Sequence, residues 1–276
     1  MNLWKPLSLV TALALSAGAL SADDRKGEDH KGKDDKEDKG HSNNPGRPGK
    51  DLPNHAQLRN ALKAVVANGT NGGIGLNMWA TLVNRDGIVV AVAFSGTNRG
   101  EQWPGSRVIS AQKANTANAF SLPGLALSTA NLYSAVQPGG SLFGLQESNP
   151  VDTSVAYRGP SENYGKPNDP MLGRKIGGVN VFGGGLALYD QNGKLVGGLG
   201  VSGDTSCTDH IIAWKIRHAL NLDKVPAGVS ATHDDNIIYD ITNGSSAGGF
   251  GHPGCDDDAT SIGNNLPTTH PVGANP

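Results

Sequence analysis

The fold depends on two segments, NMWATLVNRDGIVVAVAF at residues 77–94 and GGLALYDQNGKLVGGLGVSG at residues 184–203. Each segment contains two runs of mostly aliphatic residues, separated by a short polar stretch. The polar stretches contain Asp86-Gly87 and Asn192-Gly193, which are dipeptides that tight hairpin turns favour. Both segments are therefore predicted to form β-hairpins.

Two helices are predicted between the start of the globular region and the second hairpin. The segment HAQLRNALKAVVANG at residues 55–69 carries an apolar stripe at helical spacing and ends at a glycine. A second helix begins at Pro104, a residue favoured in the first turn, and runs through Phe120. It carries alanines small enough for another element to pack closely, at Ala111, Ala114 and Ala117. Shorter helical stretches are expected at residues 125–136 and 142–146.

The last helix of the domain is predicted to begin at Thr205 or Ser206 and to continue through Leu220. Ser206 and Asp209 have the spacing of a capping box, with aspartate in place of the usual glutamate. The order of elements is helix, hairpin, helices, long loop, hairpin, helix, without a strand–helix–strand repeat. This order predicts an α/β (α+β) fold in which a single, mainly antiparallel sheet is flanked by helices.

The N-terminal region has the pattern of an exported protein. Lys5 and the apolar run from Leu7 to Leu20 predict a signal peptide over residues 1–22. The run has about 14 residues, fewer than the roughly 20 that a membrane helix needs, so a retained membrane anchor is the alternative. Residues 23–50 are mixed in charge and lack apolar residues, which predicts a disordered charged linker. We expect a periplasmic or extracellular (secreted) protein without a membrane span after leader cleavage.

Residues 51–225 are expected to form the α/β domain and residues 226–276 an irregular C-terminal extension. The chain has two cysteines, Cys207 and Cys255. In an exported protein the default for a single pair is a disulfide, which would tether the extension to the last helix. The alternative is a reactive thiolate at Cys207, because this residue lies near a predicted helix start.

The overall charge limits the classes of partner. The formal net charge is -2 and the isoelectric point is near 6.4, so the chain lacks the basic field that nucleic acids or anionic membranes require. The sequence also shows no serine nucleophile elbow and no zinc-protease helix motif. These observations argue against nucleic-acid binding and against a hydrolase.

Three segments together carry a family resemblance: NRDGIVVAVAFSG at 84–96, PGSRVISAQKANTANAF at 104–120 and GKLVGGLGVSGDTSCTDHIIA at 193–213. In this order they resemble the GlcG/HbpS-type haem-binding family, which are small α/β domains related in shape to profilin and PAS folds. The resemblance implies non-covalent haem binding and a homo-oligomer. The chain departs from the family in its long loop at 149–175 and in its tail beyond Asn221. It also has His210 where relatives commonly carry an acidic residue.

Haem needs an apolar slot, an axial ligand and a cation near its propionates. The absence of a Cys-x-x-Cys-His motif excludes covalent attachment. His210 is the candidate metal ligand, and Trp214 and Arg217 follow it on the same stripe of the last helix. The alternative is a surface histidine beside a partly buried tryptophan. Tyr133 and Tyr157 are further candidates for a phenolate ligand.

Lys113 and Arg107 on the second helix complete the expected cofactor-binding set. Lys113 matches the lysine of the family pattern, which implies a structural or ligand-facing role. The alternative for both cations is a solvated helix face.

Three hypotheses for function follow. The first is an exported haem (tetrapyrrole)-binding protein for storage, scavenging or sensing. The second is an enzyme that degrades haem or acts on a small organic acid. The third is a ligand-free structural or accessory module that mediates assembly.

Overall fold

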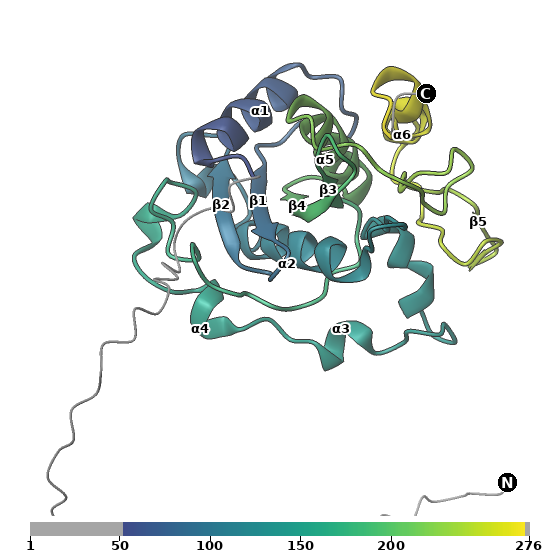
Figure 1. Ribbon diagram of the computed structural model, residues 1–276, viewed down its shortest axis with the longest axis horizontal. Helices are drawn as coiled ribbons and strands as arrows, with labels where there is room; N and C mark the ends of the chain where they lie inside the picture. Colours follow the sequence, from purple (N-terminus) through teal and green to yellow (C-terminus); the bar gives the residue numbers. More distant parts are fainter. Residues whose placement is uncertain (1–51, 274–276) are drawn as a thin grey trace, which may run out of the picture. The chain divides into compact units, whose positions relative to one another are not determined.

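The computed structural model of the protein describes residues 52–273. The predicted signal peptide at 1–22 and the predicted linker at 23–50 lie outside these residues. Four strands form one antiparallel sheet in the order β2-β1-β4-β3 (Figure 1). Their bounds are Trp79–Asn84 for β1, Val89–Phe94 for β2, Gly185–Tyr189 for β3 and Leu195–Ser202 for β4.

The sheet consists of the two hairpins predicted from the sequence. Strand β1 pairs with β2 on one side and with β4 on the other, where Trp79 lies opposite Ser202. The turn between β1 and β2 needs Gly87, whose φ is +74°, and Gly193 has a φ of +72° between β3 and β4. The predicted single antiparallel sheet is confirmed.

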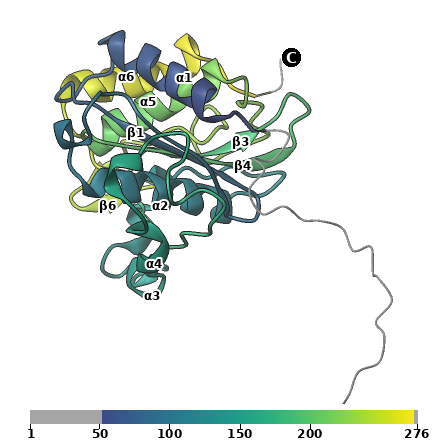
Figure 2. The ribbon, with the colours of Figure 1, turned by 90° about the vertical axis from the view of Figure 1, so that its left-hand side faces the viewer.

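Helices cover both faces of the sheet. Helix α2, Gly105–Phe120, packs on one face, whereas α1, His55–Ala67, and α5, Ser206–Ala219, lie on the other (Figure 2). The N-cap of α5 is Thr205, whose side chain accepts the N–H of Thr208. The predicted capping box is therefore wrong. The Asp209 carboxylate instead accepts the N–H groups of Gly203 and Asp204.

Helix α2 lies directly against the backbone of β4. A Cβ atom at Gly200 would overlap the carbonyl oxygen of Ser110, and one at Gly198 would overlap the carbonyl oxygen of Ala114. The glycine-rich strand and the small residues of α2 thus allow a contact that side chains on either element would prevent.

Between α2 and β3 the chain forms mostly short elements. They are the 3-10 turns Ala130–Leu132, Ser134–Val136 and Ser161–Asn163, and the helices α3, Leu145–Ser148, and α4, Thr153–Ala156. A further 3-10 turn, Arg99–Glu101, precedes α2. The helical stretch expected at 125–136 is present as two 3-10 turns, and the one expected at 142–146 is present as the short helix α3.

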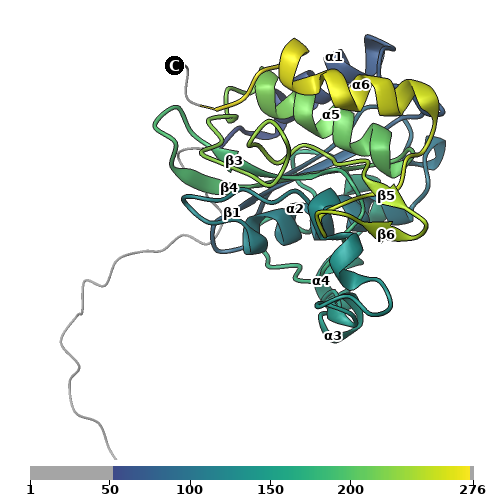
Figure 3. The same ribbon diagram turned by 90° about the vertical axis from the view of Figure 1, so that its right-hand side faces the viewer.

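In the stretch beyond α5, the last helix packs on the same side of the sheet as α1 and α5, whereas two short strands lie nearer to α2. This stretch contains the two-residue strands β5, Ile241–Thr242, and β6, Ser245–Ser246, and the helix α6, Asp257–Thr269 (Figure 3). Ile237, Ala259 and Leu266 belong to the same buried cluster as Trp214. The C-terminal stretch is therefore part of the core, and α6 is a regular helix that the sequence reasoning did not predict.

Candidate functional site

A cavity of about 640 Å³ opens at the N-terminal end of α2. This volume is within the range of small-molecule sites, roughly 300–1,000 Å³. Its walls come from β1, from the loop before α2, from the first turn of α2 and from the long loop that follows α4. They are formed by Trp79, Asn98, Arg99, Gly100, Pro104, Gly105, Arg107, Val108, Tyr157, Ser161 and Tyr164. We call this cavity the α2 cleft.

A second hollow of about 340 Å³ shares Asn98, Arg99 and Tyr164 with the α2 cleft. It adds two cations, Arg59 and Lys166, and one carboxylate, Glu162. Arg99 is exposed, and its guanidinium donates to the hydroxyl of Ser161 at 3.0 Å. The shared rim therefore carries an excess of positive charge, which favours an anionic group of a ligand.

The aromatic groups of the cleft differ in exposure. Trp79 is buried and stacks on Phe94 with ring centroids 4.6 Å apart. Its indole N–H has no hydrogen-bond partner among residues 52–273. Tyr157 is 62% exposed, so its phenol is accessible to a ligand in the cleft. An apolar wall, an accessible phenol and a cationic rim thus lie in one place.

Arg107 is the one member of the predicted cofactor set that reaches this cleft. It is 1% exposed, so the alternative of a solvated face is wrong for it. Its guanidinium binds both carboxylate oxygens of Asp169, donates to the carbonyl of Ala156 at 2.7 Å and stacks on Tyr164 at 3.6 Å. Because its charge is paired, Arg107 holds the long loop in position and leaves Arg99 as the accessible cation.

Lys113 is also buried, at 2% exposure, which excludes a solvated face. Its ammonium lies 2.6 Å from the carboxylate of Asp209 on α5. Burial raises the pKa of Asp209 to about 6, and the charge of Lys113 opposes this shift. Lys113, which matches the lysine of the family pattern, thus links α2 on one face of the sheet to α5 on the other.

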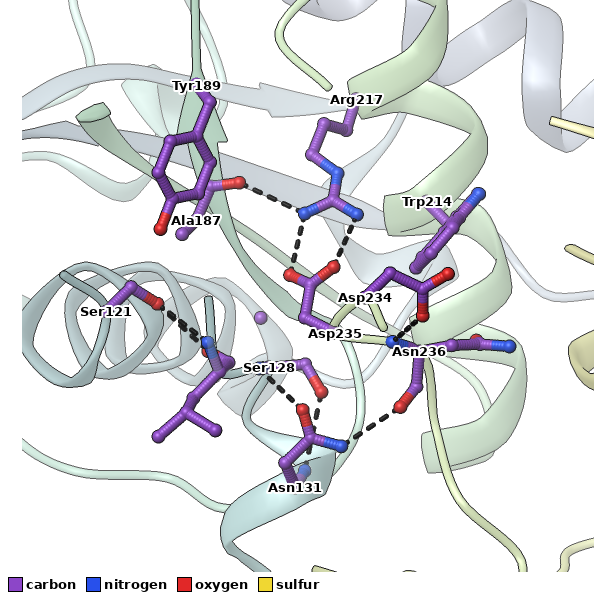
Figure 4. Close-up of polar contacts among 12 residues, drawn as sticks. Ser121, Ser128, Asn131, Ala187, Tyr189, Trp214, Arg217, Asp234, Asp235 and Asn236 are labelled. Atoms are coloured by element: carbon purple, nitrogen blue, oxygen red, sulfur yellow. Dashed lines mark hydrogen bonds and ion pairs between the residues drawn. The ribbon is translucent and has the colours of Figure 1, made fainter. Parts of the chain in front are cut away.

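The predicted stripe of α5 is covered by the C-terminal stretch. The Arg217 guanidinium donates to both carboxylate oxygens of Asp235, at 2.7 and 2.8 Å, and to the carbonyl of Ala187 at 3.1 Å (Figure 4). The indole N–H of Trp214 donates to the carbonyl of His270 at 2.8 Å. Both side chains are fully buried.

His210 lies on the same covered stripe. It is 0% exposed, so the alternative of a surface histidine is wrong. Its Nε2 is 3.3 Å from Oδ1 of Asn236 and 3.2 Å from the backbone nitrogen of Ile237. One turn before it, Cys207 forms a disulfide with Cys255, with an S–S distance of 2.03 Å. This is the disulfide that the sequence predicts for an exported protein.

The structure therefore brings His210, Trp214 and Arg217 together on one helix face but not in an open cavity. Sequence reasoning missed Arg99, Trp79 and Tyr164 as cleft residues. The available signal was the long loop at 149–175, because loops of this length in a compact domain are often functional. This loop contributes Tyr157, Ser161 and Tyr164 to the cleft.

The family model described as "Haem degrading protein HbpS-like" matches residues 54–217, which is more than half of the chain. The chain belongs to the HbpS-like family. No curated protein sequence matches it. The resemblance seen in three sequence motifs is thereby confirmed.

Solved structures resemble this HbpS-like protein at low identity. A PduOC–haem complex is 24% identical with a TM-score of 0.43, and the match covers 62% of this chain and 96% of that one. Klebsiella pneumoniae protein ORFY is 24% identical with a TM-score of 0.40, covering 63% and 96% of the two chains. A double mutant of HbpS from Streptomyces reticuli is 16% identical with a TM-score of 0.39, covering 63% and 93%.

The HbpS-like match ends at Arg217, and the residues that cover the α5 stripe lie beyond it. Asp235, Asn236, Cys255 and His270 all belong to this C-terminal stretch. Within residues 52–273, no helix is long and apolar enough to cross a membrane. In the same residues, no three side chains of His, Cys, Asp or Glu are grouped so as to hold a metal ion.

Two buried histidines of this HbpS-like protein predict that acid destabilises the disulfide-bonded form. Burial lowers the pKa of His210 to about 3 and that of His252 to about 4, from a value of 6.5, and Arg217 and Lys113 respectively add to these shifts. Below pH 6.5 the unfolded chain therefore binds two protons that the folded chain does not. Asp209 acts in the opposite direction, because its raised pKa makes the folded chain bind one extra proton below about pH 6.

The net difference between pH 6 and pH 4.5 is one proton in favour of the unfolded chain. At about 1.4 kcal/mol per proton and pH unit, we expect the free energy of unfolding to fall by about 2 kcal/mol across this interval. Urea unfolding at the two pH values measures the change. His252→Asn should remove most of this pH dependence, and a stability that rises on acidification would contradict the prediction.

Proposed function

We propose that the protein binds haem non-covalently in the α2 cleft. The observation that carries the proposal is the combination of an apolar wall, an accessible phenol at Tyr157 and a cationic rim around one cavity of suitable volume. Membership of the HbpS-like family supports it, because the family description names haem as the molecule acted on. The sequence pattern of an exported protein adds storage, scavenging or sensing outside the cytoplasm to the proposal.

The residues of the cleft suit the parts of the cofactor. Tyrosine is an established type of axial ligand for haem iron, and Tyr157 is the accessible phenol of the cleft. Arg99 and the neighbouring cations Arg59 and Lys166 would face the propionates. The apolar walls would exclude water from the macrocycle. The bound group supplies the iron and its redox chemistry, and the chain supplies the ligand, the counter-charge and the enclosure.

The α5 stripe is the competing position for the cofactor. His210 would be its ligand, with Trp214 and Arg217 as neighbours and Lys113 nearby. For haem to reach His210, the residues around Asn236 and Ile237 would have to move, and Arg217 would have to leave Asp235. The α2 cleft requires no such rearrangement, so it is the site that the geometry favours.

Hemin titration of the purified protein tests the choice between the two positions. We expect saturable binding with a Soret band that changes in shape and position in Tyr157→Phe. Arg99→Glu should weaken binding about tenfold, or about 1.4 kcal/mol. His210→Gln, a matched polar substitution on the covered stripe, should leave the spectrum unchanged.

The possible results separate the alternatives. Absence of saturable binding would end the proposal. A spectrum that responds to His210→Gln but not to Tyr157→Phe would move the cofactor to α5.

Haem degradation is a second candidate, favoured by the description of the family. The same complex treated with a reductant in air distinguishes the two functions. A Soret band that persists indicates binding alone, whereas its loss together with released iron indicates turnover. Sedimentation of the same samples tests the expected homo-oligomer, and a stable assembly that is indifferent to hemin would favour the structural module.

A further inference from the structure

The disulfide joins two segments that carry matching pairs of metal-binding residue types. The first turns of α5 hold Cys207 and His210 in a Cys-x-x-His arrangement, and the C-terminal stretch holds His252 and Cys255 in the reverse order. The bond brings the two pairs together, with 6.1 Å between the Cα atoms of the cysteines. Two cysteines and two histidines are a ligand set of structural zinc sites.

Both histidines are buried and each has one ring nitrogen without a hydrogen-bond partner. His210 is 0% exposed and His252 is 1% exposed. Among residues 52–273, neither Nδ1 of His210 nor Nε2 of His252 has a partner. Because buried polar atoms are nearly always satisfied, two such nitrogens on one ligand set point to a group that they bind in another state.

The hydrogen bonds of His252 fix which of its nitrogens is free. Its Nδ1 lies 2.7 Å from the carbonyl oxygen of Pro253. A carbonyl only accepts, so Nδ1 carries the proton and donates it. The unpartnered Nε2 therefore has an available lone pair, which is the form of imidazole that binds metal.

The sulfur atoms are placed next to the same groups. Sγ of Cys207 is 3.6 Å from the carbonyl oxygen of Pro253, the atom that accepts from His252. The backbone N–H of Cys207 lies at the start of α5 and donates to Sγ of Cys255 at 3.3 Å. An N–H at a helix N-terminus stabilises a thiolate, so this position suits Cys255 as a charged ligand as well as a bonded one.

We propose that the Cys207–Cys255 disulfide is the oxidised state of a Cys2His2 zinc site. A dithiol supplies two electrons and two protons to the bond and becomes a disulfide itself, which leaves two thiols on the protein. Binding of Zn²⁺ then releases both thiol protons. His210 binds through Nδ1 in the tautomer whose Nε2–H donates to Oδ1 of Asn236. The two thiolates and the imidazoles of His210 and His252 complete four ligands. Cys255 is exposed, so a dithiol can reach it.

In the disulfide-bonded structure the four proposed ligands are not arranged to hold a metal. With the sulfurs bonded to each other, residues 52–273 contain no group of three or more side chains arranged to hold a metal. Binding therefore requires the segment from His252 to Cys255 to shift against the start of α5. The inference is independent of haem binding in the α2 cleft, because none of its four residues lines that cleft.

Cobalt titration of the full-chain protein tests the proposal. Protein treated with a dithiol, freed of the reagent and kept without oxygen should bind one equivalent of Co²⁺. The complex should show thiolate-to-cobalt charge transfer and the intense visible bands of a tetrahedral site, and Zn²⁺ should displace the cobalt. Untreated, disulfide-bonded protein should show neither signal.

Variants distinguish a built site from thiols that bind metal without the histidines. Cys255→Ser and His252→Asn should each lower the affinity for Co²⁺ at least tenfold, whereas the control His233→Asn, on an exposed histidine outside the set, should not. Far-UV circular dichroism accompanies each titration. A reduced chain that loses its fold and regains it with Zn²⁺ supports the site.

Three results would overturn the proposal. They are a folded reduced protein that binds no Co²⁺, a reduced protein that stays unfolded with Zn²⁺, and binding that is unchanged in His252→Asn. In each of these cases the disulfide is a structural crosslink only.

Discussion

Replacing Asp235 by asparagine should lower the free energy of unfolding by about 3–5 kcal/mol, which is the usual cost of leaving one charge of a buried pair without its partner. Arg217 and Asp235 have no exposed side-chain surface. The guanidinium would keep the carbonyl of Ala187 and the ring of Trp214, at 4.7 Å, but these neutral groups do not balance its charge. Urea unfolding at neutral pH measures the loss.

A matched substitution separates this effect from a general cost of removing a carboxylate. Asp86 is exposed in the turn between β1 and β2, and Asp86→Asn should change stability by less than about 0.5 kcal/mol. Limited proteolysis adds a local readout, because Asp235→Asn should expose the stretch beyond α5 before the rest of the chain. Equal stability of the two variants would mean that the pair does not hold this stretch in place.

Loss of the disulfide should have a similar effect. The bond closes a loop with a sequence separation of 48, for which the chain-entropy relation gives about 4 kcal/mol. Cys207→Ala/Cys255→Ala should therefore unfold at a clearly lower urea concentration than the wild type, measured with a chelator to exclude metal. The comparison also tests the pairing itself.

The control for this double variant is the reductant. A dithiol should destabilise the wild-type protein to about the level of Cys207→Ala/Cys255→Ala and should leave the variant unchanged. If the two proteins unfold alike before reduction, the bond contributes nothing to stability.

Local chemistry explains which parts of the fold could be predicted. Asp86-Gly87 and Asn192-Gly193 set two turns within a few residues, and each turn brings its own strands together. The small residues Ala111, Ala114 and Ala117 on α2 predicted a close contact but not its partner, which is the backbone of β4. Helix α6 was missed because residues 226–276 were predicted to be irregular. In fact Asp256 is the N-cap, and its side chain accepts the N–H of Ala259.

The candidate site was harder to predict because it depends on pairings far apart in the sequence. Arg107 meets Asp169 and Lys113 meets Asp209, at separations of 62 and 96 residues. The sequence around Arg107 and Lys113 does not indicate that their charges form buried ion pairs. Arg99 looked like any loop cation, and only the folded arrangement shows that it is the accessible one at the α2 cleft. Whether His210 binds a cofactor stays a prediction.

The contact between α2 and bare backbone on β4 has a consequence for how this protein could acquire new specificities. Main-chain atoms that touch directly leave no rotamers to adjust, so the helix is fixed in register and tilt. The wall that α2 contributes to the cleft is therefore fixed in position. A change in ligand specificity would therefore have to come from the loop before α2 and the long loop after α4, which form the rest of the cleft. Replacing these two loops should change which ligands bind without disturbing the sheet.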